Sequence, residues 1–325
     1  MFHIEILYII LALSCSLQWN SAGTTVAGDG NGAAAVTLNR LRTPSDVILD
    51  SSNTLYIADS GNNRVQRWLA GATTGSTVAG QAGGTQGNGS NQLNSPAGVV
   101  IGSSGNIYVA DTGNNRIQLW SSGAVQGTSI VNTGLSSPSR ITRNANTGIL
   151  YVSDRGAHRV IRIDPATRTV TRVAGGNTGG NANTQLNSPN GIYFSSTSNS
   201  LVIANSGAHN IVRWVIGATT GTVLAGTTGV SGNTATQLSN PTGVTFDSMG
   251  NMYVADTGNH RIQFFRSGQT VGTTIAGTET AGIGASSLSS PSAVRLDNQE
   301  IANELPTRKI VVGISSNKGI RRKQK

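Results

Sequence analysis

The stretch IYVADTGNNRIQLW, residues 107–120, reads as two short strands joined by a polar turn. Apolar and polar residues alternate up to Asp111, a Gly-Asn-Asn turn follows, and a second alternating run begins at Arg116. This pattern is typical of a β-hairpin, because Gly and Asn readily adopt the positive φ angles of tight turns. An acid and a base so close in sequence could also be the reactive pair of an active site. The number of copies distinguishes the two interpretations.

The same hairpin pattern occurs five times along the chain. The copies are LYIADSGNNRVQRW from residue 55, the stretch above from 107, LYVSDRGAHRVIRI from 150, LVIANSGAHNIVRW from 201 and MYVADTGNHRIQFF from 252. A Pro-led segment such as SPAGVVIG precedes each copy, and a segment such as TVAG follows it. Pro lacks an N–H and suits the first residue of a strand. Four short strands per unit, repeated around an axis, predict a β-propeller.

The ends of the chain set the number of blades. The stretch KIVVGISSNKGIRRKQK, residues 309–325, fits the hairpin pattern poorly, with Ile314 in the Asp position and Gly319 in the Arg position. The stretch TTVAG, residues 24–28, matches TTIAG at 273–277. We therefore predict an all-β, six-bladed propeller of four-stranded antiparallel blades, whose ring closes when strand 24–28 pairs with the C-terminal blade. The predicted blades cover about 44–80, 96–131, 138–174, 189–226, 241–277 and 291–325.

The combined pattern Pro-x-Gly-Val and Tyr-Val-Ala-Asp-x-Gly-Asn-x-Arg-Ile-Gln resembles the NHL repeat over roughly residues 24–300. The resemblance implies a six-bladed propeller over residues 23–325. The family includes RNA-binding tripartite-motif proteins, sensor domains of bacterial kinases and the peptide-amidating lyase. The resemblance therefore implies the fold far more than the function.

The Asp–Arg pair recurs in four of the five copies, whereas a catalytic acid is expected once in a chain. The copy at 201–214 has Asn205 and Asn210, so both charges are lost together. Removing one partner of a buried ion pair costs several kcal/mol, whereas replacing both is nearly neutral. We therefore predict structural ion pairs across the hairpins and no catalytic residue. The pairs are Asp59 with Arg64, Asp111 with Arg116, Asp154 with Arg159, and Asp256 with Arg261.

Three histidines occupy one turn position in consecutive copies and could suggest an open zinc site, which uses three protein ligands. Equivalent turns on a six-fold ring are too far apart to share one ion, and Asn takes the same position in two copies. We expect turn residues, no metal and no cofactor. Candidate binding residues on this rim are Asn62, Asn63, Asn114, Asn115, His158, His209, His260, Asn132 and Thr133.

Two further sets of residues have a structural and a functional interpretation. Trp68, Trp120 and Trp214 end third strands; packing between blades is favoured over a platform for stacking sugars or bases. Asp50 and Asp247 end inner strands and could bind a cation, but turns use Asp routinely.

Polar loops that differ in length between blades predict a binding surface. Long loops cover 79–96, 174–189 and 225–241, while 131–138 is short and would leave a notch. Because recognition usually lies in loops on a rigid scaffold, we predict a monomeric, non-catalytic binding module for a protein, peptide or glycan. The alternative is a metal-dependent lyase or lactonase. In amidating lyases, metal-binding histidines stand where this chain has Ser45, Ala97, Ser139, Asn190, Thr242 and Ser292.

Both termini carry distinct signals. Residues 305–325 hold seven of the positive charges behind the net +9, which favours a solvated tail over a polyanion- or nucleic-acid-binding site. Residues 1–22 contain the apolar run IEILYIILALSCSL and are predicted to be a signal peptide, with a membrane anchor as the alternative. We therefore expect a secreted protein without disulfides, because Cys15 is the only cysteine, and a glycosylation site at Asn88.

Overall fold

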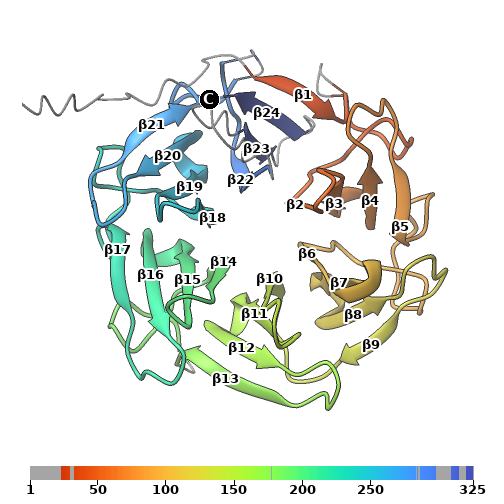
Figure 1. Cartoon of the computed structure of the whole chain (residues 1–325), viewed down its shortest axis with the longest axis horizontal. Coiled ribbons are helices and arrows are strands. Elements are labelled where there is room, and N and C mark those ends of the chain that lie inside the picture. Colours follow the sequence, from red (N-terminus) through yellow and green to blue (C-terminus); the bar gives the residue numbers. More distant parts are fainter. Residues whose placement is uncertain are drawn as a thin grey trace, which may run out of the picture.

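Six four-stranded sheets stand around a central axis in the computed structural model (Figure 1). The structure describes residues 23–29, 33–176, 178–282, 284, 286–297, 309–314 and 320–324. Neighbouring strands of each sheet are antiparallel, so the prediction of a six-bladed propeller with four-stranded blades is confirmed. The predicted signal or anchor segment, residues 1–22, lies outside the described residues.

The strands follow the four-part repeat closely. Blade 1 contains β2 (Asp46–Leu49), β3 (Leu55–Asp59), β4 (Arg64–Trp68) and β5 (Ser76–Gly80). Blade 2 contains β6 (Gly98–Ile101), β7 (Ile107–Asp111), β8 (Arg116–Trp120) and β9 (Thr128–Val131). Blade 3 contains β10 (Pro138–Arg143), β11 (Leu150–Asp154), β12 (Arg159–Ile163) and β13 (Val170–Gly175). Blade 4 contains β14 (Pro189–Ser195), β15 (Ser200–Asn205), β16 (Asn210–Val215) and β17 (Thr222–Gly226). Blade 5 contains β18 (Pro241–Phe246), β19 (Met252–Asp256), β20 (Arg261–Phe265) and β21 (Thr273–Ala276). Blade 6 contains β22 (Pro291–Leu296), β23 (Lys309–Ile314), β24 (Ile320–Gln324) and β1 (Thr24–Ala27).

The two ends of the chain close the ring. Strand β1 pairs with β24, with Thr25 opposite Arg321, and this confirms the predicted closure. Strand β23 pairs with β22 so that Ile314 lies opposite Pro291. The equivalent position holds Asp256 in blade 5, opposite Pro241, so the sixth blade keeps the register of the repeat without its acid. The basic C-terminal stretch thus contributes its backbone to the last blade.

Short 3-10 turns follow the second strand of five blades and end in a left-handed residue. The residue in this position is Asn or His with φ between 49° and 56°, a conformation that Asn adopts more readily than most residues. These turns are η1 (Ser60–Asn62), η3 (Thr112–Asn114), η4 (Arg155–Ala157), η5 (Ser206–Ala208) and η6 (Thr257–Asn259), and a sixth, η2 (Ser103–Gly105), joins β6 to β7.

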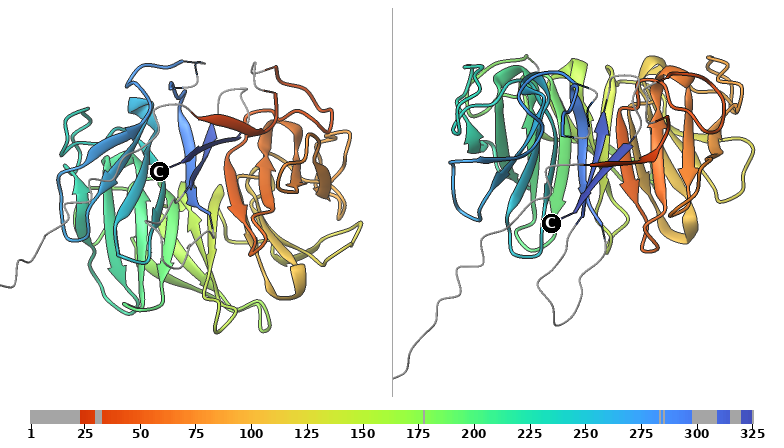
Figure 2. Two further views of the ribbon diagram at one scale, coloured as in Figure 1. Left: turned by 45° about the horizontal axis from the view of Figure 1, so that its top comes forward. Right: turned by 90° about the horizontal axis from the view of Figure 1, so that it is seen from above.

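The direction of the strands gives the ring two different faces (Figure 2). Second and fourth strands run the same way, so their following turns and interblade loops share one face, which we call the loop face. The turns that follow first and third strands lie on the opposite side, which we call the turn face. Within the part of the chain that the structure describes, no helix has the length and apolar character needed to span a membrane.

Apolar clusters hold the blades against one another. Trp68 packs with Ala27 and Val311, joining blade 1 to blade 6. Trp120 and Trp214 are buried in clusters that join blades 1 and 2, and blades 3 and 4. The three tryptophans are therefore packing residues, as the structural interpretation of the sequence predicts.

Candidate binding site on the loop face

Each Asp–Arg pair forms a short ion pair beneath the loop face. The carboxylate Oδ2 lies 2.9 Å from the arginine Nε in Asp59–Arg64, 2.6 Å in Asp111–Arg116, and 2.8 Å in both Asp154–Arg159 and Asp256–Arg261. All four carboxylates are buried. Burial raises the pKa of Asp59, Asp111 and Asp256 above the usual value, and the neighbouring Asn, Arg and backbone N–H donors oppose this rise.

The pairs also hold the preceding interblade loop. In blade 2, the Asn94 N–H donates to Asp111 Oδ1 over 2.7 Å. The Arg116 guanidinium donates to the carbonyls of Asn88, Gly89 and Gln92 over 2.7–3.0 Å. Blades 1 and 5 repeat this arrangement. Each of these Asp–Arg pairs thus joins its hairpin to the preceding loop, an arrangement that we call a clamp. The carboxylate and the guanidinium have their hydrogen-bond partners within the protein.

Blade 4 keeps part of this clamp without charge. The Asn205 Oδ1 accepts the Asn187 N–H over 2.6 Å, as the Asp oxygen does elsewhere. Asn210 Nδ2 donates to the Thr228 hydroxyl over 2.7 Å. The joint loss of acid and base therefore leaves the backbone contact to the loop in place.

Most of the predicted rim residues bind the loops. The left-handed residue of each turn accepts a backbone N–H from the following interblade loop. The acceptors are Asn63 and Asn115 through Oδ1, and His158, His209 and His260 through Nδ1, over 2.7–3.1 Å. Asn62 and Asn114 donate to the carbonyls of Ala35 and Gly87. Each histidine thus has its own separate partner, and no three His, Cys, Asp or Glu among the described residues are grouped as a metal site would require. Asn132 and Thr133 are exposed.

A cavity of about 270 Å³, lined mainly by Ser and Thr residues, occupies the loop-face mouth of the central channel. Its walls come from the inner strands, at the positions that hold histidines in amidating lyases, and from the 3-10 turns. The lining residues include Ser45, Ser139, Asn190, Thr242 and Ser292. The buried Asn190 Oδ1 has no hydrogen-bond partner among the described residues. The mouth is therefore surrounded by hydroxyl groups, of which those of Ser45, Thr242 and Ser292 already donate to backbone carbonyls.

One arginine interrupts a ring of hydroxyls around this mouth. In blades 1, 2, 4 and 5 the first turn residue is Ser or Thr, and its hydroxyl donates to a proline carbonyl of the next blade. Blade 3 has Arg155 instead. Arg155 is exposed and lines the cavity, and its guanidinium forms no ion pair or hydrogen bond within the described residues. A free cation therefore replaces an interblade hydrogen bond at this one position.

Because the loop beside blade 3 is short, a second arginine has fewer loop partners and is more exposed than its counterparts. Arg159 donates only to the Gly134 carbonyl of this loop, over 2.5 Å, whereas Arg116 reaches three loop carbonyls. Its side chain is 27% exposed, against 0–10% for the three other paired arginines. The notch predicted at 131–138 thus lies next to two accessible cations.

Charged residues block the channel below the mouth. Arg140 of β10 crosses the channel and donates to the carbonyls of Ser45, Ala97 and Ser292 in blades 1, 2 and 6. Asp46 lies 3.6 Å from Arg140 Nε and 3.2 Å from Arg295 Nη2. Burial lowers the pKa of Arg140 below its usual value, and Asp46 opposes this. This cluster was not predicted from the sequence, although Asp46 and Arg140 replace the small residue of the Pro-x-Gly pattern.

The six radial sheets and the loop-covered channel mouth define the molecule as a β-propeller. NHL-repeat models match residues 41–68, 93–119 and 238–265, which fall in blades 1, 2 and 5 and the loops before them. Because the remaining blades continue the same pattern of strands and turns, the chain belongs to the NHL-repeat propellers.

Solved structures of similar fold have diverse roles. An auxiliary nutrient-binding protein from Bacteroides thetaiotaomicron has 16% identity and a TM-score of 0.70, over 94% of this chain and 76% of its own. A gluconolactonase from Xanthomonas campestris has 14% identity and a TM-score of 0.60, over 93% and 94%. A streptogramin B lyase has 13% identity and a TM-score of 0.56, over 86% and 78%. No curated protein sequence matches the chain. At sequence identities this low, the similarity to these structures shows a shared fold and says nothing about function.

Proposed function

We propose that the chain is a secreted, non-catalytic binding module that takes an acidic ligand on its loop face, where blade 3 meets the short loop 131–138. The observation that carries this proposal is Arg155, a free and exposed cation in a position that the other complete hairpins give to Ser or Thr. Arg159 adds a second accessible guanidinium, and the channel mouth adds hydroxyls. Guanidinium groups bind carboxylates through paired, charge-assisted hydrogen bonds. An acidic peptide or an acidic glycan fits this chemistry.

A binding screen with a reverting variant tests the proposal. We expect the protein to retain members of an array of acidic peptides and glycans. The substitution Arg155→Thr should weaken retention about tenfold, since it removes one charge-assisted contact. It should also stabilise the fold by about 1 kcal/mol, because Thr can donate to the Pro189 carbonyl as its counterparts do in other blades. The matched control is Arg67→Gln, which removes an exposed arginine from outside this site. Equal retention by all three proteins would refute the proposed site.

Lengthening the short loop provides an independent test. Replacing residues 132–137 with the longer loop sequence of 81–95 should supply Arg159 with further carbonyl partners and fill the notch. We expect ligand retention to be lost while the melting temperature is maintained. Retention by the lengthened variant would place the ligand elsewhere.

The enzyme alternative has support from the gluconolactonase and the lyase among proteins of similar fold. A metal-dependent lactonase or lyase would hold its ion in the channel mouth. Metal analysis of the purified protein distinguishes the two functions: stoichiometric zinc or calcium would favour the enzyme, and the binding module is expected to bind its ligand after treatment with a chelator.

A further inference from the structure

Blade 3 has more arginines than the other blades that precede the C-terminal one. Residues 138–175 contain seven arginines and two acids, whereas the matching segments of blades 1, 2, 4 and 5 contain one or two arginines each. Both acids are engaged, because Asp154 pairs with Arg159 and Asp164 accepts two backbone N–H groups of its own turn. Blade 3 therefore has a surplus of positive charge.

Three of these arginines belong to the hairpin on the outer side of the blade. This hairpin consists of β12 and β13, and β13 is the outermost strand of blade 3 (Figure 1). Arg162 lies on β12, Arg168 in the connecting turn and Arg172 on β13. Arg168 and Arg172 are exposed, and Arg162 is partly exposed. We call these three residues the blade 3 flank.

The strand register places the three arginines close together. Arg172 lies opposite Ile161, the chain neighbour of Arg162, so the Cα atoms of the two arginines are about 6 Å apart. The Arg168 N–H donates to the Asp164 carbonyl over 2.7 Å, which holds Arg168 at the turn-face end of the same hairpin. The positive charges thus form one strip along the outer side of the blade.

The two arginines on the strands lie on opposite sides of the blade edge. Arg162 pairs with Tyr151, which stacks on Phe194 of blade 4. Arg172 pairs with Ile161, which packs in the cluster between blades 2 and 3. The outer edge of β13 runs between them and pairs with no other strand among the described residues, so it presents backbone N–H groups to solvent. A chain that follows this edge meets guanidinium groups on both sides.

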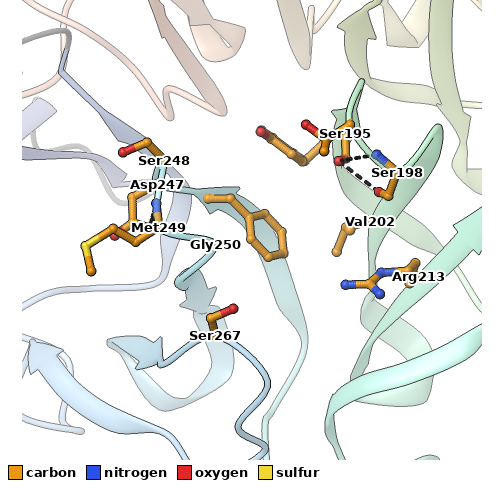
Figure 3. Close-up of a pocket in the computed structure, with 12 residues that line it drawn as sticks. Ser195, Ser198, Val202, Arg213, Asp247, Ser248, Met249, Gly250 and Ser267 are labelled. Atoms are coloured by element: carbon orange, nitrogen blue, oxygen red, sulfur yellow. Dashed lines mark hydrogen bonds between the residues drawn. The ribbon is translucent and has the colours of Figure 1, made fainter.

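The other blades have no comparable group of cations on their outer hairpins. Arg67, Arg213 and Arg266 are each the only exposed arginine of their hairpin, in blades 1, 4 and 5. Arg213 occupies the position of Arg162, and it lines a cavity of about 420 Å³ together with the acid Asp247 (Figure 3). A cluster of exposed arginines is therefore a property of blade 3 among these blades.

We propose that the blade 3 flank binds a linear sulfated glycan. Guanidinium groups bind tetrahedral oxyanions through paired, charge-assisted hydrogen bonds, and the guanidinium groups of Arg162 and Arg168 have no partner in the described part of the chain. The exposed Thr171, opposite Arg162, adds a hydroxyl beside them. Single-stranded nucleic acids are held largely by aromatic side chains that stack on the bases, and residues 159–175 contain no aromatic residue.

This surface is independent of the site proposed on the loop face. That site consists of Arg155, Arg159 and the channel mouth, and none of the flank residues belongs to it. Either proposal can therefore fail without the other.

Titration of the whole protein with a size-defined heparin oligosaccharide tests the proposal. We expect saturable binding that weakens steeply between about 0.05 and 0.3 M salt, because salt screens exposed charges. The triple substitution Arg162→Gln, Arg168→Gln and Arg172→Gln should weaken binding about tenfold and leave the melting temperature unchanged, because these side chains lie at the surface. Absence of saturable binding to the wild-type protein would overturn the proposal.

A matched triple variant separates the cluster from the net charge. Arg67→Gln, Arg213→Gln and Arg266→Gln remove the same charge from three separate blades and should weaken heparin binding less than about twofold. Equal losses in the two triple variants would show that net charge alone determines binding. Wild-type affinity in the blade 3 variant would place the heparin elsewhere on the protein. Either result would overturn the proposal.

A single-stranded RNA with the same number of negative charges distinguishes the glycan from a nucleic acid. We expect the RNA to bind about tenfold more weakly than the heparin oligosaccharide, because the flank offers no ring on which a base can stack. An RNA that binds as tightly as heparin, and loses as much affinity in the blade 3 variant, would overturn the assignment of the flank to a sulfated glycan.

Discussion

A chain that starts at residue 29 is expected to unfold at a much lower denaturant concentration than one that starts at residue 23. The deletion removes β1, whose pairing with β24 closes the ring. Ala27 and Val26 would no longer pack in the cluster that joins blades 1 and 6. Burial of the valine contributes about 1.5–3 kcal/mol and each ladder hydrogen bond about 1 kcal/mol. The free energy of unfolding should therefore fall by about 5 kcal/mol, as measured by urea titration of the two proteins.

The deletion also leaves the edge of β24 unpaired, and unpaired edges favour association between molecules. Light scattering should detect dimers or larger species of the shorter chain. A synthetic peptide of residues 23–29 added in excess should restore part of the stability, whereas a scrambled peptide should not. Equal unfolding midpoints for the two chains would contradict closure by β1.

The second large effect concerns the clamp in blade 2. The substitution Arg116→Ala should lower the free energy of unfolding by about 3–5 kcal/mol, because it leaves the Asp111 carboxylate buried without its counter-charge. The three loop carbonyls that Arg116 contacts also lose their donor. The double substitution Asp111→Asn with Arg116→Asn copies blade 4 and should cost less than about 2 kcal/mol.

Urea unfolding of the single and double variants measures this difference, with Arg67→Ala as a control for the loss of an exposed arginine. A double variant that is as unstable as Arg116→Ala would show that the loop contacts of Arg116, rather than the charge balance, determine the cost. A single variant of wild-type stability would show that the pair contributes nothing to the fold.

The repeat made the fold predictable from the sequence, down to the pairing of the chain ends. TTVAG matches the fourth strand of blade 5, and this match predicts its place in the last blade because each blade needs the same four strands. Position in the repeat alone predicts the register of the degenerate strand β23, with Ile314 at the position of the acid. Repetition thus supplied information that one copy could not.

The functional residues were harder to predict. Residues that recur from blade to blade stabilise the fold, whereas the proposed binding residues are exceptions to the repeat. Most of the predicted rim residues recur, and the structure uses Asn63 and His158 to hold loops. The site proposed on the loop face instead involves Arg155, which departs from the Ser or Thr of its column. A comparison of each column for its odd member would have revealed this residue. Which exceptions share a cavity depends on blade geometry, which the sequence does not specify.

Arg140 of blade 3, which crosses the central channel, separates the loop face from the turn face. Arg140 and its partners leave one cavity at the loop-face mouth and a separate one towards the turn face, whose lining includes Ile48, Val100 and Leu296. A small molecule that enters one mouth cannot leave through the other while Arg140 is in place. Arg140 therefore divides the central channel into two compartments. One molecule could be bound on each face of the ring at the same time, without passing through the channel to the other face.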